Sequence, residues 1–150
     1  MSNDLMTECP LDVKQSIDID APIEIAFDAL LEQLGPANVH PDGYSMKLVL
    51  EARPGGRWFR DLGDNNGHLW GHVQVIKRPA LLEICGPLFM SYPALSHVQF
   101  RLAEERGRTT VSVQHRAIGP VEAAHREGVG RGWKGMLEGA RGIAAKRTTP

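Results

Sequence analysis

The stretch that decides the fold is Arg53-Pro54-Gly55-Gly56-Arg57-Trp58, in a chain of 150 residues. A Pro-Gly-Gly run is typical of a tight turn. On one side of it, Met46, Leu48 and Leu50 alternate with Lys47, Val49 and Glu51, which is the period of a half-buried strand, and residues 57–62 return the chain on the other side. The run therefore predicts a hairpin in an antiparallel sheet.

The residues before this hairpin predict one strand and one helix. Residues 13–20 alternate apolar and polar side chains and form the first expected strand. Pro22 suits the first turn of a helix, and apolar residues follow it at helical spacing as far as Leu34. Gly35-Pro36 should end this helix, and residues 37–44 indicate an irregular loop.

The residues after the hairpin predict a series of strands without helical crossovers. These strands are expected at residues 68–78, 80–85, 97–102 and 111–115. On the first of them, Leu69, Gly71, Val73 and Val75 share one face. Six or seven consecutive strands, with one helix near each end of the chain, predict an antiparallel α+β domain.

The last part of the chain predicts an amphipathic helix. Residues 120–127 indicate a short helical turn, and the long helix should restart near Gly130. Beside its apolar stripe lies a second stripe of glycines, namely Gly128, Gly132, Gly135, Gly139 and Gly142. Each interior glycine costs about 0.5 to 1 kcal/mol relative to Ala. The stripe indicates either close approach of the first helix or a second subunit, or merely a Gly-rich composition.

Composition and charge exclude several classes of protein. The hydrophobic share of 42% and the charged share of 23% are those of an ordinary folded domain. The formal net charge of -1, without a basic block, favours neither nucleic acid nor an anionic membrane surface as a partner. No apolar run is long enough to span a bilayer, and residues 1–12 lack the pattern of a signal peptide, so we expect a cytoplasmic protein. Cys9 and Cys85 do not indicate a disulfide framework.

The order and spacing of several short motifs resemble a known family. The motifs are Ala21-Pro22 followed by Phe27, the stretch 53–58, Gly71-x-Val73 before Pro79, and Gly132-Trp133 with Leu137. Together they resemble the helix-grip fold of the START and Bet v 1 (SRPBCC) superfamily, in the branch named after the C-terminal domain of the activator of Hsp90 ATPase. The resemblance implies a curved antiparallel sheet of six to seven strands that wraps around a long C-terminal helix. It covers residues 13–147, with flexible tails expected at 1–12 and 148–150.

The resemblance also implies an apolar cavity between the sheet and the C-terminal helix. The mouth of that cavity is this chain's own, because residues 35–40 and 84–87 lack the aromatic residues that the branch often has there. By alternation, the side chains expected on the cavity side are Phe27, Leu30, Met46, Leu48, Trp58, Val73, Val75, Ile84, Val98, Phe100, Val113, His115, Trp133, Met136 and Leu137. Most residues of such a set are ordinary core, and a minority line a pocket.

Three short patterns in the sequence resemble sites for a dinucleotide, a metal ion or a nucleophile, but their surroundings do not support these functions. Residues 130–135 spell G-x-G-x-x-G, but they follow a helix-like segment rather than a strand, which excludes a dinucleotide site. His68 and His72 would lie about 13 Å apart on a strand, too far to share one metal ion. Cys85 stands without a G-x-S-x-G elbow or a paired base, so nucleophilic catalysis has no support. We predict no metal and no cofactor.

His115 is the polar residue of the expected cavity face. Burial of its ring would favour the neutral form, whether it faces a ligand or, alternatively, bonds a backbone group as a core histidine. If the domain is an enzyme, His115 and His40 are candidate acid–base groups, and Asp42 and Tyr44 lie near His40 in the chain. Spacing alone gives these side chains no common geometry.

The sequence leaves three functions open. We favour a carrier or sensor that binds a small hydrophobic molecule in the cavity. The alternatives are a cyclase- or hydrolase-type enzyme that uses the same cavity, and a module that binds a protein partner, as the name of the branch suggests. The glycine stripe makes a homodimer an additional expectation.

Overall fold

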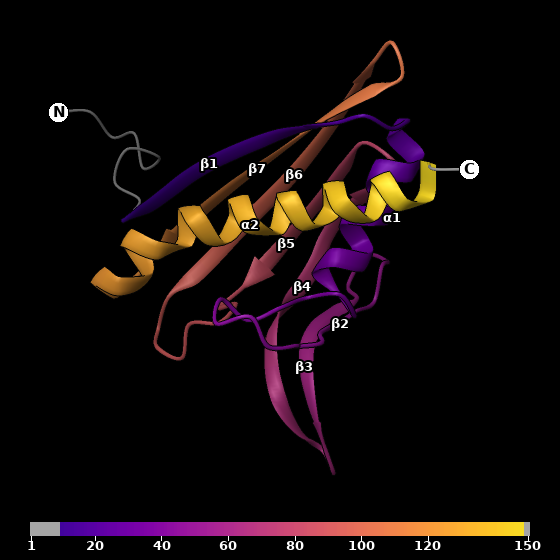
Figure 1. Cartoon of the computed structure of the whole chain (residues 1–150). Coiled ribbons are helices and arrows are strands. Elements are labelled where there is room, and N and C mark those ends of the chain that lie inside the picture. The colour runs from indigo at the N-terminus through magenta and orange to yellow at the C-terminus, as the bar shows by residue number, and fades with distance from the viewer. Residues whose placement is uncertain (1–9, 149–150) are drawn as a thin grey trace, which may run out of the picture.

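The computed structural model describes residues 10–148. Its main element is a curved sheet of seven antiparallel strands (Figure 1). The strands are β1 (Leu11–Ile19), β2 (Val49–Leu50), β3 (Arg57–Gly63), β4 (Asn66–Lys77), β5 (Leu81–Gly86), β6 (Leu95–Glu105) and β7 (Arg108–Ile118). Their order across the sheet is β1-β7-β6-β5-β4-β3-β2. The first strand in the chain thus pairs with the last, and the strands between them follow one another as a meander, as expected for an antiparallel α+β domain.

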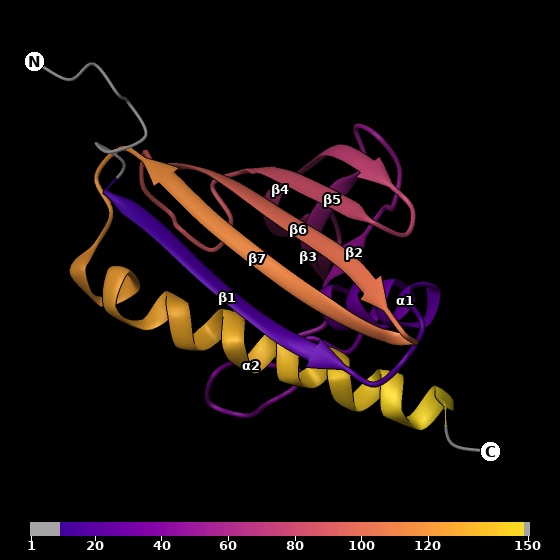
Figure 2. The same ribbon diagram turned by 90° about the horizontal axis from the view of Figure 1, so that it is seen from above.

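Two helices cover the inner face of this sheet. Helix α1 (Ile23–Leu34) follows β1, and helix α2 (Ala123–Thr148) crosses in front of the sheet, with β1 above it (Figures 1 and 2). Pro22 precedes α1 in an extended conformation, and the Gly35 amide donates to the Glu32 carbonyl at the other end. The predicted helix-grip fold is confirmed: a seven-stranded sheet bends around a long C-terminal helix.

Tight turns join the long strands where the sequence has residues that tolerate positive φ. The β3–β4 turn places Asp64 and Asn65 at φ 53° and 61°, and the β6–β7 turn places Arg106 and Gly107 at 56° and 78°. Two successive positive φ values are those of the type I′ turn, whose twist matches that of a two-stranded ribbon. At Gly56, in the deciding stretch, a Cβ would lie 1.9 Å from the Glu51 carbonyl oxygen, so only glycine fits.

Several element boundaries differ from the sequence-based expectations. Strand β1 begins at Leu11, which is 2% exposed, so the ordered domain starts before residue 13. The strand expected at 46–51 is reduced to β2. The break expected before Gly130 was wrong, because α2 runs without interruption from Ala123 to Thr148. Cys9 and most of the expected N-terminal tail lie outside the described residues.

The glycine stripe on α2 has two different environments. A Cβ at Gly139 would lie 2.4 Å from the Gln33 side-chain oxygen, so α1 packs closely at this position. A Cβ at Gly128, Gly132, Gly135 or Gly142 would meet nothing within 4 Å. Close approach of α1 therefore accounts for Gly139. Contact of a second subunit with the other four glycines stays a prediction. Within residues 10–148, neither helix has the length and apolar character needed to cross a membrane.

Candidate functional site at the aromatic end of the core

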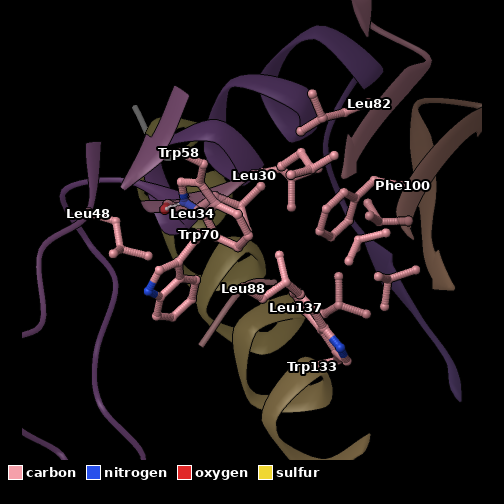
Figure 3. Close-up of a cluster of buried hydrophobic side chains, with 14 of the residues drawn as sticks. Leu30, Leu34, Leu48, Trp58, Trp70, Leu82, Leu88, Phe100, Trp133 and Leu137 are labelled. Carbon is pink, nitrogen blue, oxygen red and sulfur yellow. Dashed lines mark hydrogen bonds between the residues drawn. The ribbon is translucent and has the colours of Figure 1, made fainter. Parts of the chain in front are cut away.

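Most of the predicted cavity residues meet between the sheet and α2, as Figure 3 shows for several of them. The fully buried ones are Phe27, Leu30, Leu48, Trp58, Val73, Ile84, Val98, Phe100, Val113, His115, Trp133 and Leu137. Met46 and Met136 are partly buried and pack against the same cluster. The prediction that these residues point inward is thus confirmed, but whether any of them binds a ligand stays a prediction.

Val75 is the exception, and its predicted orientation was wrong. Val73 pairs with Ile84, whereas Val75 pairs with Glu83, so the register shifts by one residue between them. The shift is a β-bulge, which adds a residue to one strand and turns the side chains beyond it to the other face. Val75 consequently shares the outer face of the sheet with Glu83, and Ile76 takes the inner position.

His115 has partners for both of its ring nitrogens inside the core. The Trp133 indole Nε1–H donates to Nδ1 at 3.0 Å, and Nε2 lies 2.8 Å from the Ser96 hydroxyl. Because an indole can only donate, Nδ1 is unprotonated, and the neutral ring donates from Nε2 to Ser96. Burial of the ring lowers the pKa of His115 to about 4. The ring therefore ties α2 to β6 and β7 as a neutral hydrogen-bonding group.

The other candidate acid–base group, His40, lies in the loop between α1 and β2. Its ring stacks on Tyr44 with centroids 4.3 Å apart, and the Asp42 backbone amide donates to Nδ1 at 3.1 Å. Its hydrogen bond is thus to its own loop, whereas those of His115 are to β6 and α2. The structure brings His40, Asp42 and Tyr44 together, but it does not join them to His115 in one acid–base pair.

Side chains fill the space between the sheet and α2. Trp58, Phe100 and Leu137 are at most 1% exposed there. Two depressions of the surface lie elsewhere: one over the outer face of β1, β6 and β7, beside Lys14 and Arg101, and one at the β6–β7 hairpin. A ligand can therefore enter the predicted site only if part of this core opens.

One end of the core reaches the surface through a row of aromatic rings. Trp70 packs on Phe89 with ring centroids 5.8 Å apart, Phe89 on His125 at 5.1 Å, and His125 on Tyr92 at 5.7 Å. The Tyr92 hydroxyl is also 2.6 Å from Nδ1 of His125, in the first turn of α2. Phe89, Tyr92 and His125 are half-buried, whereas Trp70 is 7% exposed. We call Trp70, Phe89, Tyr92 and His125 the aromatic row.

The backbone of β4 and β5 determines how Trp70 enters the core. Trp58 pairs with Gly71 but Phe59 pairs with Leu69, so Trp70 is the extra residue of a second β-bulge. A Cβ at Gly86 would lie 2.4 Å from the Trp70 carbonyl oxygen, and this carbonyl accepts from the Leu88 amide at 2.7 Å. The loop that carries Phe89 and Tyr92 is thus fixed directly to the backbone of Trp70.

No pattern in the sequence predicted the aromatic row. Strict alternation placed Leu69 on the inner face and hence Trp70 on the outer one, but Leu69 is 45% exposed. Phe89 and Tyr92 lie in a connection without periodicity, where no pattern assigns a face. The available signal was two aromatic residues in a short Pro-bearing loop, because aromatic side chains are costly to leave in water.

Comparison with known proteins agrees with this geometry. A family model described as activator of Hsp90 ATPase homolog 1-like protein matches residues 20–141. The chain belongs to this family. The resemblance noted in the sequence is thereby confirmed.

Solved structures share the fold of this Hsp90 activator-like chain. Protein CV1439 from Chromobacterium violaceum has a TM-score of 0.72 at 18% identity, over 90% of this chain and 97% of that one. Protein MLL2253 from Mesorhizobium loti has a TM-score of 0.70 at 18% identity, over 93% and 99% of the two chains. CalU16 from Micromonospora echinospora has a TM-score of 0.62 at 21% identity, over 89% and 75%. A comparison with curated proteins returned no match. At these identities the likeness establishes the fold alone.

Proposed function

We propose that this Hsp90 activator-like protein is a carrier or sensor that binds a small hydrophobic molecule between the sheet and α2, entering at the aromatic row. The observation that carries the proposal is the continuity of the row, from the half-buried Tyr92 and His125 at the surface to the buried Trp70. Small-molecule sites are mostly apolar and aromatic, with a few polar groups that orient the ligand. The row supplies both kinds of group.

The enzyme alternative has less support from the contacts of this chain. A general acid or base must reach the proton that it transfers. Both nitrogens of His115 are already bonded to Ser96 and Trp133, and the ring is buried. A cyclase- or hydrolase-type reaction would have to break this network first, so we place a binding role before a catalytic one. A protein partner, a homodimer and a cytoplasmic location stay predictions.

The test is binding of the neutral dye N-phenyl-1-naphthylamine to the purified full-length protein, measured by the fluorescence of the dye. Phe89→Ala removes a central ring of the row and should weaken dye binding by about tenfold, since burying a large apolar side chain contributes about 1.5 to 3 kcal/mol. Leu62→Ala is the matched control, because Leu62 is 61% exposed near the end of β3 and is not part of the aromatic row.

The outcomes separate clearly. Saturable binding that Phe89→Ala weakens and Leu62→Ala leaves unchanged supports entry at the aromatic row. Absence of saturable binding, or equal affinities for all three proteins, contradicts it. Native mass spectrometry of gently purified protein, with analysis of the released compound, would identify the natural ligand.

A further inference from the structure

The indole N–H of Trp70 is buried without an acceptor among residues 10–148. The other two tryptophans of the chain are satisfied: Trp58 donates to the Leu34 carbonyl at 2.7 Å, and Trp133 donates to His115 at 3.0 Å. A buried donor without a partner loses its bond to water and gains nothing in return. Of the three tryptophans in this core, only Trp70 therefore has an indole N–H without a hydrogen-bond acceptor.

The direction of this N–H matters as much as its burial. The rings packed on Trp70 are Trp58, Phe89 and His68, with centroids 5.1, 5.8 and 6.2 Å away. In Figure 3 the Trp70 nitrogen points away from Trp58 and from the middle of the cluster, to the side on which Leu48 lies. Leu48 has no side-chain acceptor. The donor thus faces the apolar margin of the core, at the inner end of the aromatic row.

We infer that the ligand proposed above is not a plain hydrocarbon but an aromatic or apolar molecule with a neutral oxygen acceptor, such as a ketone, which receives the Trp70 Nε1–H. This inference rests on the proposed function. An acceptor is required because the indole can only donate. A neutral one is favoured because Trp58 and Phe89 carry no charge, and an unpaired carboxylate buried beside them would be far more costly than a carbonyl.

The experiment uses two probes of nearly the same shape, 2-acetylnaphthalene and 2-ethylnaphthalene, of which only the first carries a carbonyl. The full-length protein is labelled with ¹⁵N-tryptophan, and its three indole signals are assigned with Trp→Phe variants. The Trp70 signal should lie upfield of the other two in the free protein, because its proton is not hydrogen-bonded. It should move downfield with 2-acetylnaphthalene and not with 2-ethylnaphthalene.

Affinities measured with the same probes give a second readout. The ratio of ketone affinity to hydrocarbon affinity should fall by about tenfold in Trp70→Phe, the worth of one buried hydrogen bond. Trp58→Phe is the matched control, because it removes the same atoms from a neighbouring ring whose N–H is already bonded to Leu34. In that variant the ratio should stay at its wild-type value. The indole signals of the wild-type protein decide the question even if a variant does not fold.

Three results would contradict the role of Trp70 as a hydrogen-bond donor to the ligand, and they differ in what they mean for the proposed function. A Trp70 signal that lies downfield in the free protein, and does not move with the ketone, shows that a water molecule already occupies the donor and overturns the inference. Binding of both probes with an unchanged ratio in Trp70→Phe overturns it while the proposed function stands. Failure of both probes to bind contradicts the proposed function and the inference together.

Discussion

Acid should destabilise this protein through one buried side chain, His115. The unfolded ring takes up a proton below its ordinary pKa of 6.5, whereas burial lowers the pKa of the folded ring to about 4. Between these two values the unfolded state binds more protons than the folded state, so the free energy of unfolding falls as the pH falls. The difference of about 2.5 pKa units is equivalent to about 3 kcal/mol, most of which is lost between pH 7 and pH 4.

The perturbation that isolates this effect is His115→Gln, which removes the titrating ring but keeps a polar side chain. The variant should be less stable than the wild type at pH 7, by about 1 to 3 kcal/mol, because the hydrogen bonds to Ser96 and Trp133 are disrupted. At pH 4 the gap between the two proteins should shrink or reverse, by a change of about 3 kcal/mol. Urea denaturation from pH 7 to pH 4, followed by circular dichroism, measures both quantities.

Ser96→Ala is the control for this experiment. It removes the acceptor of the Nε2–H but leaves the buried imidazole in place. The variant should therefore lose stability at all pH values and still keep the acid dependence of the wild type. Parallel curves for the wild type and His115→Gln between pH 7 and pH 4 would refute the reasoning, since they would show that the ring of His115 titrates alike in the folded and unfolded states.

Two further predictions concern matched pairs of substitutions, each measured by urea denaturation. Gly132→Ala should stabilise the protein by about 0.5 to 1 kcal/mol, because a Cβ there meets nothing within 4 Å, whereas Gly139→Ala should gain less, because its Cβ would have to displace the side-chain amide of Gln33. A loss of stability in Gly132→Ala that depends on protein concentration would instead reveal a second subunit on this face. Trp58→Phe should cost about 1 to 2 kcal/mol more than Trp70→Phe, because both remove the same atoms but only the first gives up a hydrogen bond. Equal costs would contradict the lack of an acceptor at Trp70.

Local patterns were enough to predict most of the fold. Alternation placed the strands, and positive-φ turns at positions such as Asn65 and Gly107 joined them, because these choices depend on a few adjacent residues. The inward orientation of His115 followed from the same rule and is confirmed. Its partners could not be predicted, since Ser96 and Trp133 come from different elements and no spacing rule relates them.

The errors arose where tertiary packing overrides a local rule. Each β-bulge adds one residue, so a single period of two cannot hold on both of its sides. The period that fits Gly71 and Val73 therefore assigns Trp70, before them, and Val75, after them, to the wrong face. The helix break expected near Gly130 is absent, although Gly128 and Gly130 both have low helix propensity. Val129, between these glycines, is buried at 7% exposure, and packing of this kind stabilises a helix beyond what propensity alone predicts.

Helix α2 is attached to the rest of the domain in different ways along its length. Its middle is held by the buried bond between Trp133 and His115. Its first turn is held by the half-buried ring of His125, which contacts Phe89 and Tyr92. Gly128 and Gly130 lie just after that first turn, where glycine weakens helix formation. We therefore expect local unfolding of α2 to reach this first turn before it reaches Trp133, and the aromatic row leads inward from the same turn. Opening of the first turn of α2 would thus expose the proposed entrance to the core.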